Sequence, residues 1–138
     1  ALHKRFGSTP AAWRGLVDTK LRGKVAFGQL CRALDTLGFD GSRGETWKAL
    51  CKGRTYFTFQ DLDGAGYELL LATRECLLAK YGCLVKAWRE GLDPICTEWV
   101  SFEEFRKMHK LHALPGTARQ VFDILRKEWA TMCLKMDD

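Results

Sequence analysis

The sequence lacks a long apolar run. Its best apolar stretch, residues 67–84, is interrupted by four charged side chains, namely Glu68, Arg74, Glu75 and Lys80. A transmembrane helix needs about 20 consecutive, mostly apolar residues, so this stretch would be a poor membrane span. With 46% of its 138 residues apolar, the chain can bury one core or two small helical cores without disulfides or metal. We therefore expect a soluble globular protein without a membrane partner.

Cysteine pairs are also missing. The six cysteines never form Cys-x-x-Cys, the spacing on which common zinc and redox motifs depend. They are Cys31, Cys51, Cys76, Cys83, Cys96 and Cys133. Cysteines that lie beside leucines in helical patterns behave as small buried apolar side chains. We predict reduced thiols, and hence a cytoplasmic, reducing compartment.

Residues for catalysis and phosphate binding are scarce. A catalytic site needs a nucleophile, a base and an orienting group close together, and His3, His109 and His112 provide no such cluster. His109 and His112 are spaced to share a helix face, but nothing nearby completes a zinc shell, so surface histidines are favoured. Gly64-x-Gly66 lacks the rest of a nucleotide-binding fingerprint. We expect no enzyme activity, no cofactor and no small-molecule substrate.

Clustered positive charge is limited as well. The net charge of +5 comes from dispersed residues, and no interleaving of aromatic and basic residues accompanies it, so nucleic acid is not the expected partner. A basic face could form from Arg14, Lys20, Arg22, Lys24, Lys52 and Arg54. It would suit acidic proteins, lipid head groups or nucleic acid, but a solvated surface is the favoured interpretation.

What the sequence does contain is an internal repeat. Shifting the chain by 75 positions without a gap aligns Trp13 with Trp88 and Asp18 with Asp93, and similar matches run through both halves. Duplication explains such a distribution. We predict two units, residues 1–75 and 76–138. Because the second copy ends before it supplies a counterpart of the first copy's last helix, we expect the chain to be part of a longer repeat protein.

Helix punctuation is clear within each unit. Thr9-Pro10 predicts a cap before a proline in the first turn, and three segments read as capping boxes, at Ser42, Ser101 and Thr117. Predicted helices lie near residues 9–17, 28–37, 43–51, 64–80, 83–92, 101–112 and 117–127. Three short extended stretches, residues 24–26, 56–58 and 99–101, separate some of them and could pair only as two-residue ribbons.

The arrangement of helix, twelve-residue loop and helix resembles the EF-hand. Loop 18–29 begins with Asp18, carries Gly23 at its sixth position and Val25 at its eighth, and loop 93–104 again begins with aspartate. A shorter loop around residues 52–54 lies between them. The chain looks most like large tandem-repeat EF-hand proteins of unicellular eukaryotes. The resemblance implies an all-α fold of paired hands with very short β-ribbons between paired loops.

Calcium binding is poorly supported by the loop residues. EF-hand loops supply oxygens from positions 1, 3, 5, 7, 9 and 12, and loop 18–29 has Lys20, Arg22 and Gln29 at three of these. Loop 93–104 retains a candidate weak site, which comprises Asp93, Thr97, the Trp99 carbonyl, Ser101 and Glu104. Alternatively, Ser101 and Glu104 cap the following helix without metal. In either case we expect hydrogen bonds or side chains to replace the ion in most loops.

Three tryptophans fall at apolar family positions before the loops and are predicted core residues, namely Trp13, Trp47 and Trp88. Trp99 and Trp129 fall outside this pattern and are candidate contacts with a partner or a neighbouring repeat.

The resemblance implies a calcium-independent protein-interaction or scaffold module whose partner is another protein or a neighbouring repeat. Two alternatives stay open. One is a weak calcium sensor or buffer that uses loop 93–104, and the other is a basic module that contacts polyanions or a membrane surface.

Overall fold

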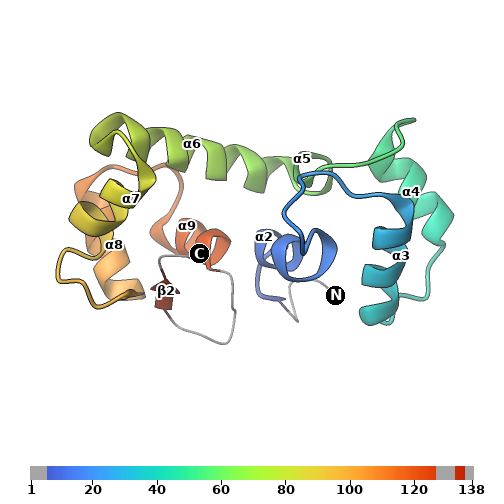
Figure 1. Ribbon diagram of the computed structural model, residues 1–138, viewed down its shortest axis with the longest axis horizontal. Coiled ribbons are helices and arrows are strands. Elements are labelled where there is room, and N and C mark those ends of the chain that lie inside the picture. The colour runs from blue at the N-terminus through green and yellow to red at the C-terminus, as the bar shows by residue number, and fades with distance from the viewer. Residues whose placement is uncertain (1–5, 127–132, 136–138) are drawn as a thin grey trace. The chain divides into compact units, whose positions relative to one another are not determined.

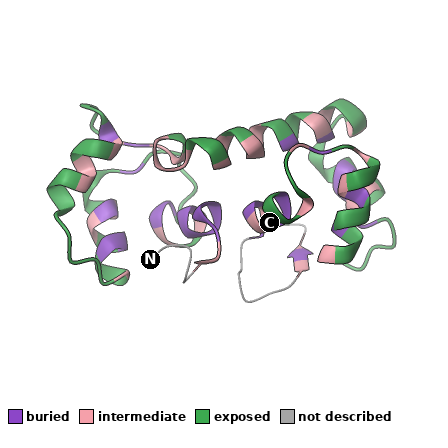
Figure 2. Cartoon of the chain, turned by 180° about the vertical axis from the view of Figure 1, so that it is seen from behind, coloured by how far each residue is buried: buried purple, intermediate pink, exposed green. Residues whose placement is uncertain are grey.

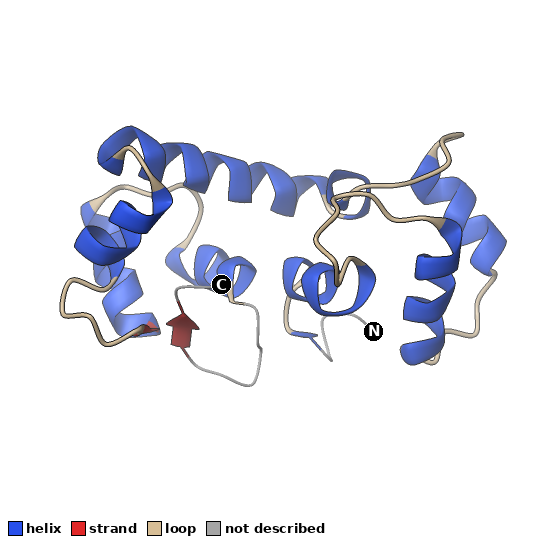
Figure 3. Cartoon of the chain, viewed as in Figure 1, coloured by secondary structure: helices blue, strands red, loops and turns tan. Residues whose placement is uncertain are grey.

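The computed structural model describes residues 6–126 and 133–135. These residues are mostly helical and include one small antiparallel sheet (Figure 3), which confirms the predicted helical fold class. The chain separates into two compact units, Ala1–Tyr67 and Glu68–Asp138. This division and the predicted boundary after residue 75 both fall within one helix, α6 (Gly64–Tyr81).

The first unit consists of short helices joined by loops (Figure 1). Helix α2 (Thr9–Ala12) continues into the π-helical segment η1 (Trp13–Val17), and α3 (Phe27–Thr36) and α4 (Arg43–Cys51) follow. These elements confirm the predicted helices near residues 9–17, 28–37 and 43–51. A further four-residue helix, α5 (Phe59–Leu62), was not predicted.

Side-chain caps explain where two of these helices begin. The Ser42 hydroxyl accepts a hydrogen bond from the Glu45 backbone, as the capping pattern predicts. At α2, however, the cap is Ser8, whose hydroxyl accepts from the Ala11 N–H at 3.2 Å. The prediction that Thr9 caps this helix is therefore wrong by one residue, because Thr9 already lies in its first turn.

The core of the first unit surrounds Phe57, which is fully buried. Phe57 and Val25 exchange two backbone hydrogen bonds as an isolated antiparallel bridge, the ribbon predicted between residues 24–26 and 56–58. Trp13 and Trp47 place their rings edge-on against Phe57, at centroid distances of 5.6 and 6.0 Å. Trp13 is buried as predicted, whereas Trp47 is only partly buried.

The second unit repeats the pattern. Its elements after α6 are α7 (Leu84–Lys86), the π-helical η2 (Ala87–Leu92), β1 (Trp99–Ser101), α8 (Phe102–Leu111), α9 (Ala118–Leu125) and β2 (Cys133–Lys135). The predicted helices near residues 83–92 and 101–112 are confirmed, as is the helix near 117–127 as far as the structure describes it.

The second core includes Trp88, as predicted, and Leu77 of α6. Strands β1 and β2 pair antiparallel with Val100 opposite Leu134, and both of these side chains are buried. Val100 thus corresponds to Val25, but its partner lies two positions later than a shift of 75 residues predicts. Figure 2 shows the buried residues of each unit in purple.

Among the described helices, none has both the length and the apolar content that crossing a bilayer requires. All six cysteines are free thiols. Only Cys51 is buried, however, and Cys83 and Cys96 are exposed, so the prediction that the cysteines act as buried apolar residues is wrong for these two. Cys83 caps a helix and Cys96 lies in a loop at positive φ, and neither position faces a core.

Candidate functional site

Loop 18–29 is organised by one buried carboxylate. Asp18 is only 1% exposed. Its Oδ1 accepts the Arg22 N–H at 3.0 Å, and its Oδ2 accepts the Gly23 N–H at 2.6 Å. Hydrogen bonds to an ionised acceptor are stronger than neutral ones. The aspartate therefore holds the fifth and sixth residues of the loop by direct hydrogen bonds.

Loop 93–104 is closed in the same way. Asp93 Oδ1 accepts the Thr97 N–H at 2.9 Å, and Oδ2 accepts the Glu98 N–H at 2.7 Å. The Thr97 hydroxyl lies 3.0 Å from Oδ1, and the Trp88 side chain also hydrogen-bonds to Asp93. A carboxylate has about four lone-pair sites, so these partners take up most of its capacity. Burial alone would raise the pKa of Asp93, but the hydrogen bonds outweigh it and hold the pKa below its usual value.

The helix before each loop widens into a π-helical turn. The Asp18 N–H donates to the Trp13 carbonyl, and the Asp93 N–H donates to the Trp88 carbonyl, each at 2.7 Å and each across five residues. Both aspartates then leave the helix with similar backbone angles. A π-turn adds one residue to the helical circuit and is frequent at functional sites. The two loops thus share a local geometry as well as residue types.

Positive φ angles fall at the same positions of both loops. Leu21 and Gly23 have φ of 51° and 74° in the first loop, and Cys96 and Glu98 have 56° and 64° in the second. Glu98 therefore adopts the left-handed turn that glycine adopts at position 23. A non-glycine residue in this conformation costs about 1–2 kcal/mol, and the hydrogen bond from its N–H to Asp93 offsets part of that cost.

Replacing Glu98 by glycine is expected to stabilise the second unit by about 1 kcal/mol, because glycine adopts positive φ without a steric penalty. Urea unfolding of the full chain measures the change. The matched control is Glu98→Ala, which removes the same side chain but keeps the penalty, so its stability should stay close to that of the wild type. Equal stabilisation by both variants would contradict a backbone origin.

The side chain of the last residue of each loop accepts a hydrogen bond from the backbone three residues earlier. Glu104 Oε2 accepts the Ser101 N–H and hydroxyl at 2.8 and 2.7 Å, and these bonds hold the pKa of Glu104 below its usual value. Gln29 likewise accepts the Ala26 N–H at 3.0 Å. The capping role that was the alternative for Ser101 and Glu104 is thus observed.

The other two residues of the predicted weak calcium site bond to each other. The Thr97 hydroxyl lies 2.8 Å from the Trp99 carbonyl oxygen, to which it can donate a hydrogen bond. Within residues 6–126 and 133–135, no three His, Cys, Asp or Glu side chains come together as a metal site.

The short loop of the first unit contains a positively charged side chain, Arg54, that pairs with an aspartate. The Arg54 guanidinium forms an ion pair with Asp61 and donates from Nε to the Cys51 carbonyl at 3.1 Å. Lys52 Nζ lies 3.6 Å from the same carboxylate. The hydrogen bond from Arg54 has the largest effect and, together with hydrogen bonds from Thr58, holds the pKa of Asp61 far below its usual value. Burial acts in the opposite direction but is outweighed. Lys52 and Arg54 thus supply the positive charge beside this carboxylate.

Acid should weaken the first unit through Asp61. A carboxylate whose pKa is depressed by folding stabilises the fold above its unfolded-state pKa of about 4, and this stability is lost as the pH falls below that value. We expect urea unfolding at decreasing pH to show this loss in the wild type and less of it in Asp61→Asn. The control Asp40→Asn, which removes an exposed carboxylate, should keep the wild-type pH dependence. An unchanged acid response in Asp61→Asn would contradict the assignment.

The structure divides the six residues of the predicted basic face. Arg14 is half-buried in η1. Lys52 and Arg54 are paired with Asp61, and Lys24 and Arg54 lie over the Tyr56 ring. Lys20 and Arg22 instead line a cavity together with Arg32 of α3. Arg32 was not among the predicted residues, because it lies ten positions after Arg22 and only the fold brings the two together.

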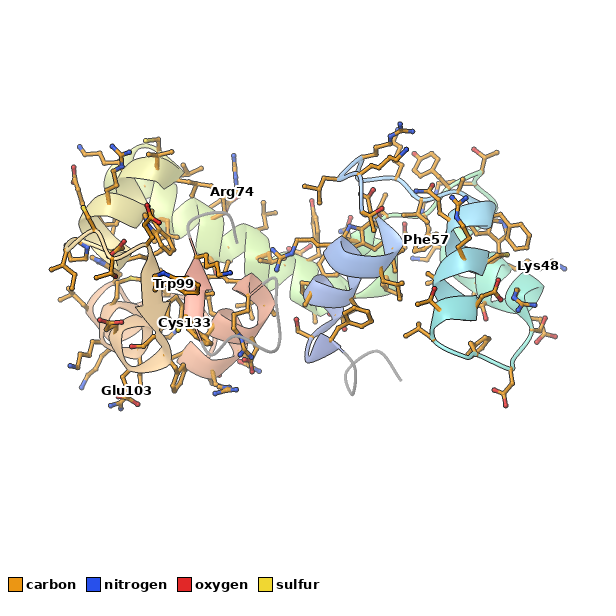
Figure 4. All side chains as sticks on the ribbon, turned by 60° about the horizontal axis from the view of Figure 1, so that its bottom comes forward. Lys48, Phe57, Arg74, Trp99, Glu103 and Cys133 are labelled. Carbon is orange, nitrogen blue, oxygen red and sulfur yellow. The ribbon has the colours of Figure 1, made fainter. Side chains whose placement is uncertain are left out.

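Of the two tryptophans proposed as partner contacts, the structure describes Trp99. Trp99 is 48% exposed on strand β1, with Lys135 Nζ 4.6 Å from its ring centroid (Figure 4). It is therefore accessible, and it lies in the extended stretch predicted at residues 99–101. Trp129 lies outside the described residues.

His109 lies in α8 and His112 directly follows it, and both are half-buried, so the expectation of surface histidines is met only in part. His112 also makes side-chain contacts. Its Nε2 lies 2.6 Å from the Tyr81 hydroxyl and its Nδ1 lies 3.0 Å from Lys80 Nζ. Burial and the nearby lysine lower the pKa of His112. These contacts fasten the end of α8 to α6.

Comparison with models of known protein families gave no match, and comparison with curated proteins found no similar sequence.

Proposed function

We propose that the chain is a calcium-independent protein-interaction or scaffold module built from degenerate EF-hand-like pairs. The observation that supports this most directly is that Asp18 and Asp93 bind the backbone of their own loops in the same way. The carboxylate at the first position of each long loop closes that loop through backbone hydrogen bonds. These bonds support a role in which each loop is held by its own carboxylate and the helices on either side contact other proteins.

Charge in the first unit supports the same proposal. Lys20 and Arg22 stand at loop positions where a calcium site needs oxygens. Arg54 supplies a positive charge within the short loop. Three cationic groups around the loops of one unit oppose a divalent cation.

A weak calcium sensor or buffer is the second candidate, and one observation favours it. The negative charge of Asp93 acts on Glu104 and raises its pKa, against the larger effect of the Ser101 hydrogen bonds. The two carboxylates are thus close enough to interact, and calcium could attract both if their hydrogen bonds opened. We propose no catalytic role for either unit.

Calorimetric titration of calcium into chelator-treated protein separates the two candidates. The scaffold proposal predicts no binding heat and the same melting temperature with and without calcium. The matched control is Glu104→Gln, which removes one charge but keeps an oxygen for the helix cap. Micromolar binding that is lost in Glu104→Gln would overturn the proposal and identify a calcium site in loop 93–104.

A further inference from the structure

A cavity of about 530 Å³ lies in the first unit, between loop 18–29, the end of η1 and α3. Leu16, Val17 and Ala33 give it apolar walls, and Lys20, Arg22 and Arg32 give it positive charge. Cavities of roughly 300–1,000 Å³ with apolar walls and a few polar groups are typical of binding sites. This one opens over the loop positions from which the resemblance to EF-hands predicts cation ligands.

The three cations that line the cavity have no acidic partner among the residues that the structure describes. Neither Lys20, Arg22 nor Arg32 forms an ion pair within the part of the chain that the structure describes. By contrast, the nearby Lys52 and Arg54 share Asp61. A cavity lined by charge of one sign concentrates ligands of the opposite sign. The site is therefore suited to an anionic ligand.

The backbone argues against phosphate as that ligand. Phosphate loops present backbone N–H groups to the ligand, but the Arg22 and Gly23 N–H groups donate to Asp18. Lys20 and Arg22 come from the loop and Arg32 from α3, and apolar side chains line the cavity with them. Separated carboxylates with an apolar side chain between them match this arrangement better than one compact phosphate.

We propose that this cavity, which we call the loop cavity, binds an acidic peptide segment of a partner protein, with carboxylates on Lys20, Arg22 and Arg32 and one apolar side chain inside. The proposal rests on the proposed interaction function and names the chemistry of its partner. Loop 18–29 would then hold an anion where the EF-hand resemblance predicts a cation.

The test is a fluorescence anisotropy titration of the full chain with a labelled peptide of alternating glutamate and leucine, in chelator and at low salt. Arg22→Glu should weaken binding by about tenfold or more, because a repulsive charge replaces an attractive one. Lys48→Glu is the matched control, since it makes the same change on the outer face of α4, outside the cavity lining (Figure 4). Its affinity should remain within about twofold of the wild type. Equal weakening by both variants would overturn the proposal.

A second variant separates the cavity from general electrostatic attraction. Ala26 lines the cavity and is exposed, so Ala26→Phe fills the space without changing any charge. We expect at least about a fivefold loss of peptide affinity, since the apolar side chain loses its place, with an unchanged melting temperature as evidence of folding. Unchanged affinity in a folded Ala26→Phe variant would overturn the proposal. Equal displacement of the peptide by inorganic phosphate and by free glutamate peptide would also overturn it.

Repeating the titration with calcium keeps this inference distinct from the proposed function. Equal affinity in chelator and in calcium supports both. Binding that requires calcium supports the loop cavity but overturns calcium independence. Absence of binding in both buffers overturns the loop cavity and leaves the calcium titration of Glu104→Gln to decide the proposed function.

Discussion

Replacing Asp18 by alanine is expected to destabilise the first unit by about 2–3 kcal/mol. The substitution removes the acceptor of two charge-assisted hydrogen bonds, from the Arg22 and Gly23 N–H groups, and bonds to charged groups contribute about 1.5–3 kcal/mol each. Because the loop is exposed, water can bond to the two freed N–H groups and so reduce the loss of stability. Urea unfolding of the full chain measures the change.

The control for this prediction is Asp35→Ala. Asp35 is an exposed carboxylate of the same unit that pairs with Arg43 at the surface, and such pairs contribute about 0–1 kcal/mol. Adding calcium should rescue neither variant. If Asp18→Ala were no more destabilising than Asp35→Ala, the carboxylate would not be holding the loop.

Replacing Phe57 by alanine is expected to destabilise the first unit by about 3–5 kcal/mol, the usual cost of removing a large buried ring. Phe57 is fully buried, and it contacts Trp13 and Trp47 edge-on. Its backbone also forms the bridge to Val25 that ties the two loops of the unit together. The substitution leaves this bridge without its side-chain packing.

Phe39→Ala is the matched control, because the same side chain is removed from a position that is 37% exposed. It should cost about 1 kcal/mol or less. Tryptophan fluorescence during urea unfolding reports both variants, since Trp13 and Trp47 lie against Phe57. Similar losses in the two variants would contradict the central position of Phe57 in the core.

The helices were predictable because their signals are local. Helix α4 occupies residues 43–51 as expected, since Ser42 and Glu45 mark its first turn in the sequence and form its cap in the structure. The buried positions of α3, which are Leu30, Ala33 and Leu34, follow the helical period.

The elements that were missed have weak local signals. Strand β2 is Cys-Leu-Lys, without the β-branched or aromatic centre that marked residues 24–26, 56–58 and 99–101, and only its pairing with β1 makes it a strand. Helix α5 is a single turn, too short to show a period. The π-turns depend on hydrogen bonds across five residues, which no residue pattern in the sequence announces.

The positions of the loops in the candidate site could be predicted from the sequence. The side-chain contacts around these loops could not. The spacing from Asp18 to Gln29 identified the first loop, and the loss of ligand residues predicted that other groups replace the ion. Which groups contact the loops depends on the fold. Arg54 meets Asp61, and Arg32 joins Lys20 and Arg22 at the loop cavity, only after the chain has folded.

Amide hydrogen exchange at Gly23 and Glu98 in metal-free protein tests the central claim most directly, because these two N–H groups donate to Asp18 and Asp93. If the aspartates close the loops without an ion, both amides are protected from exchange in chelator, and calcium does not change their rates. Rapid exchange in chelator that becomes slow on adding calcium would contradict the account.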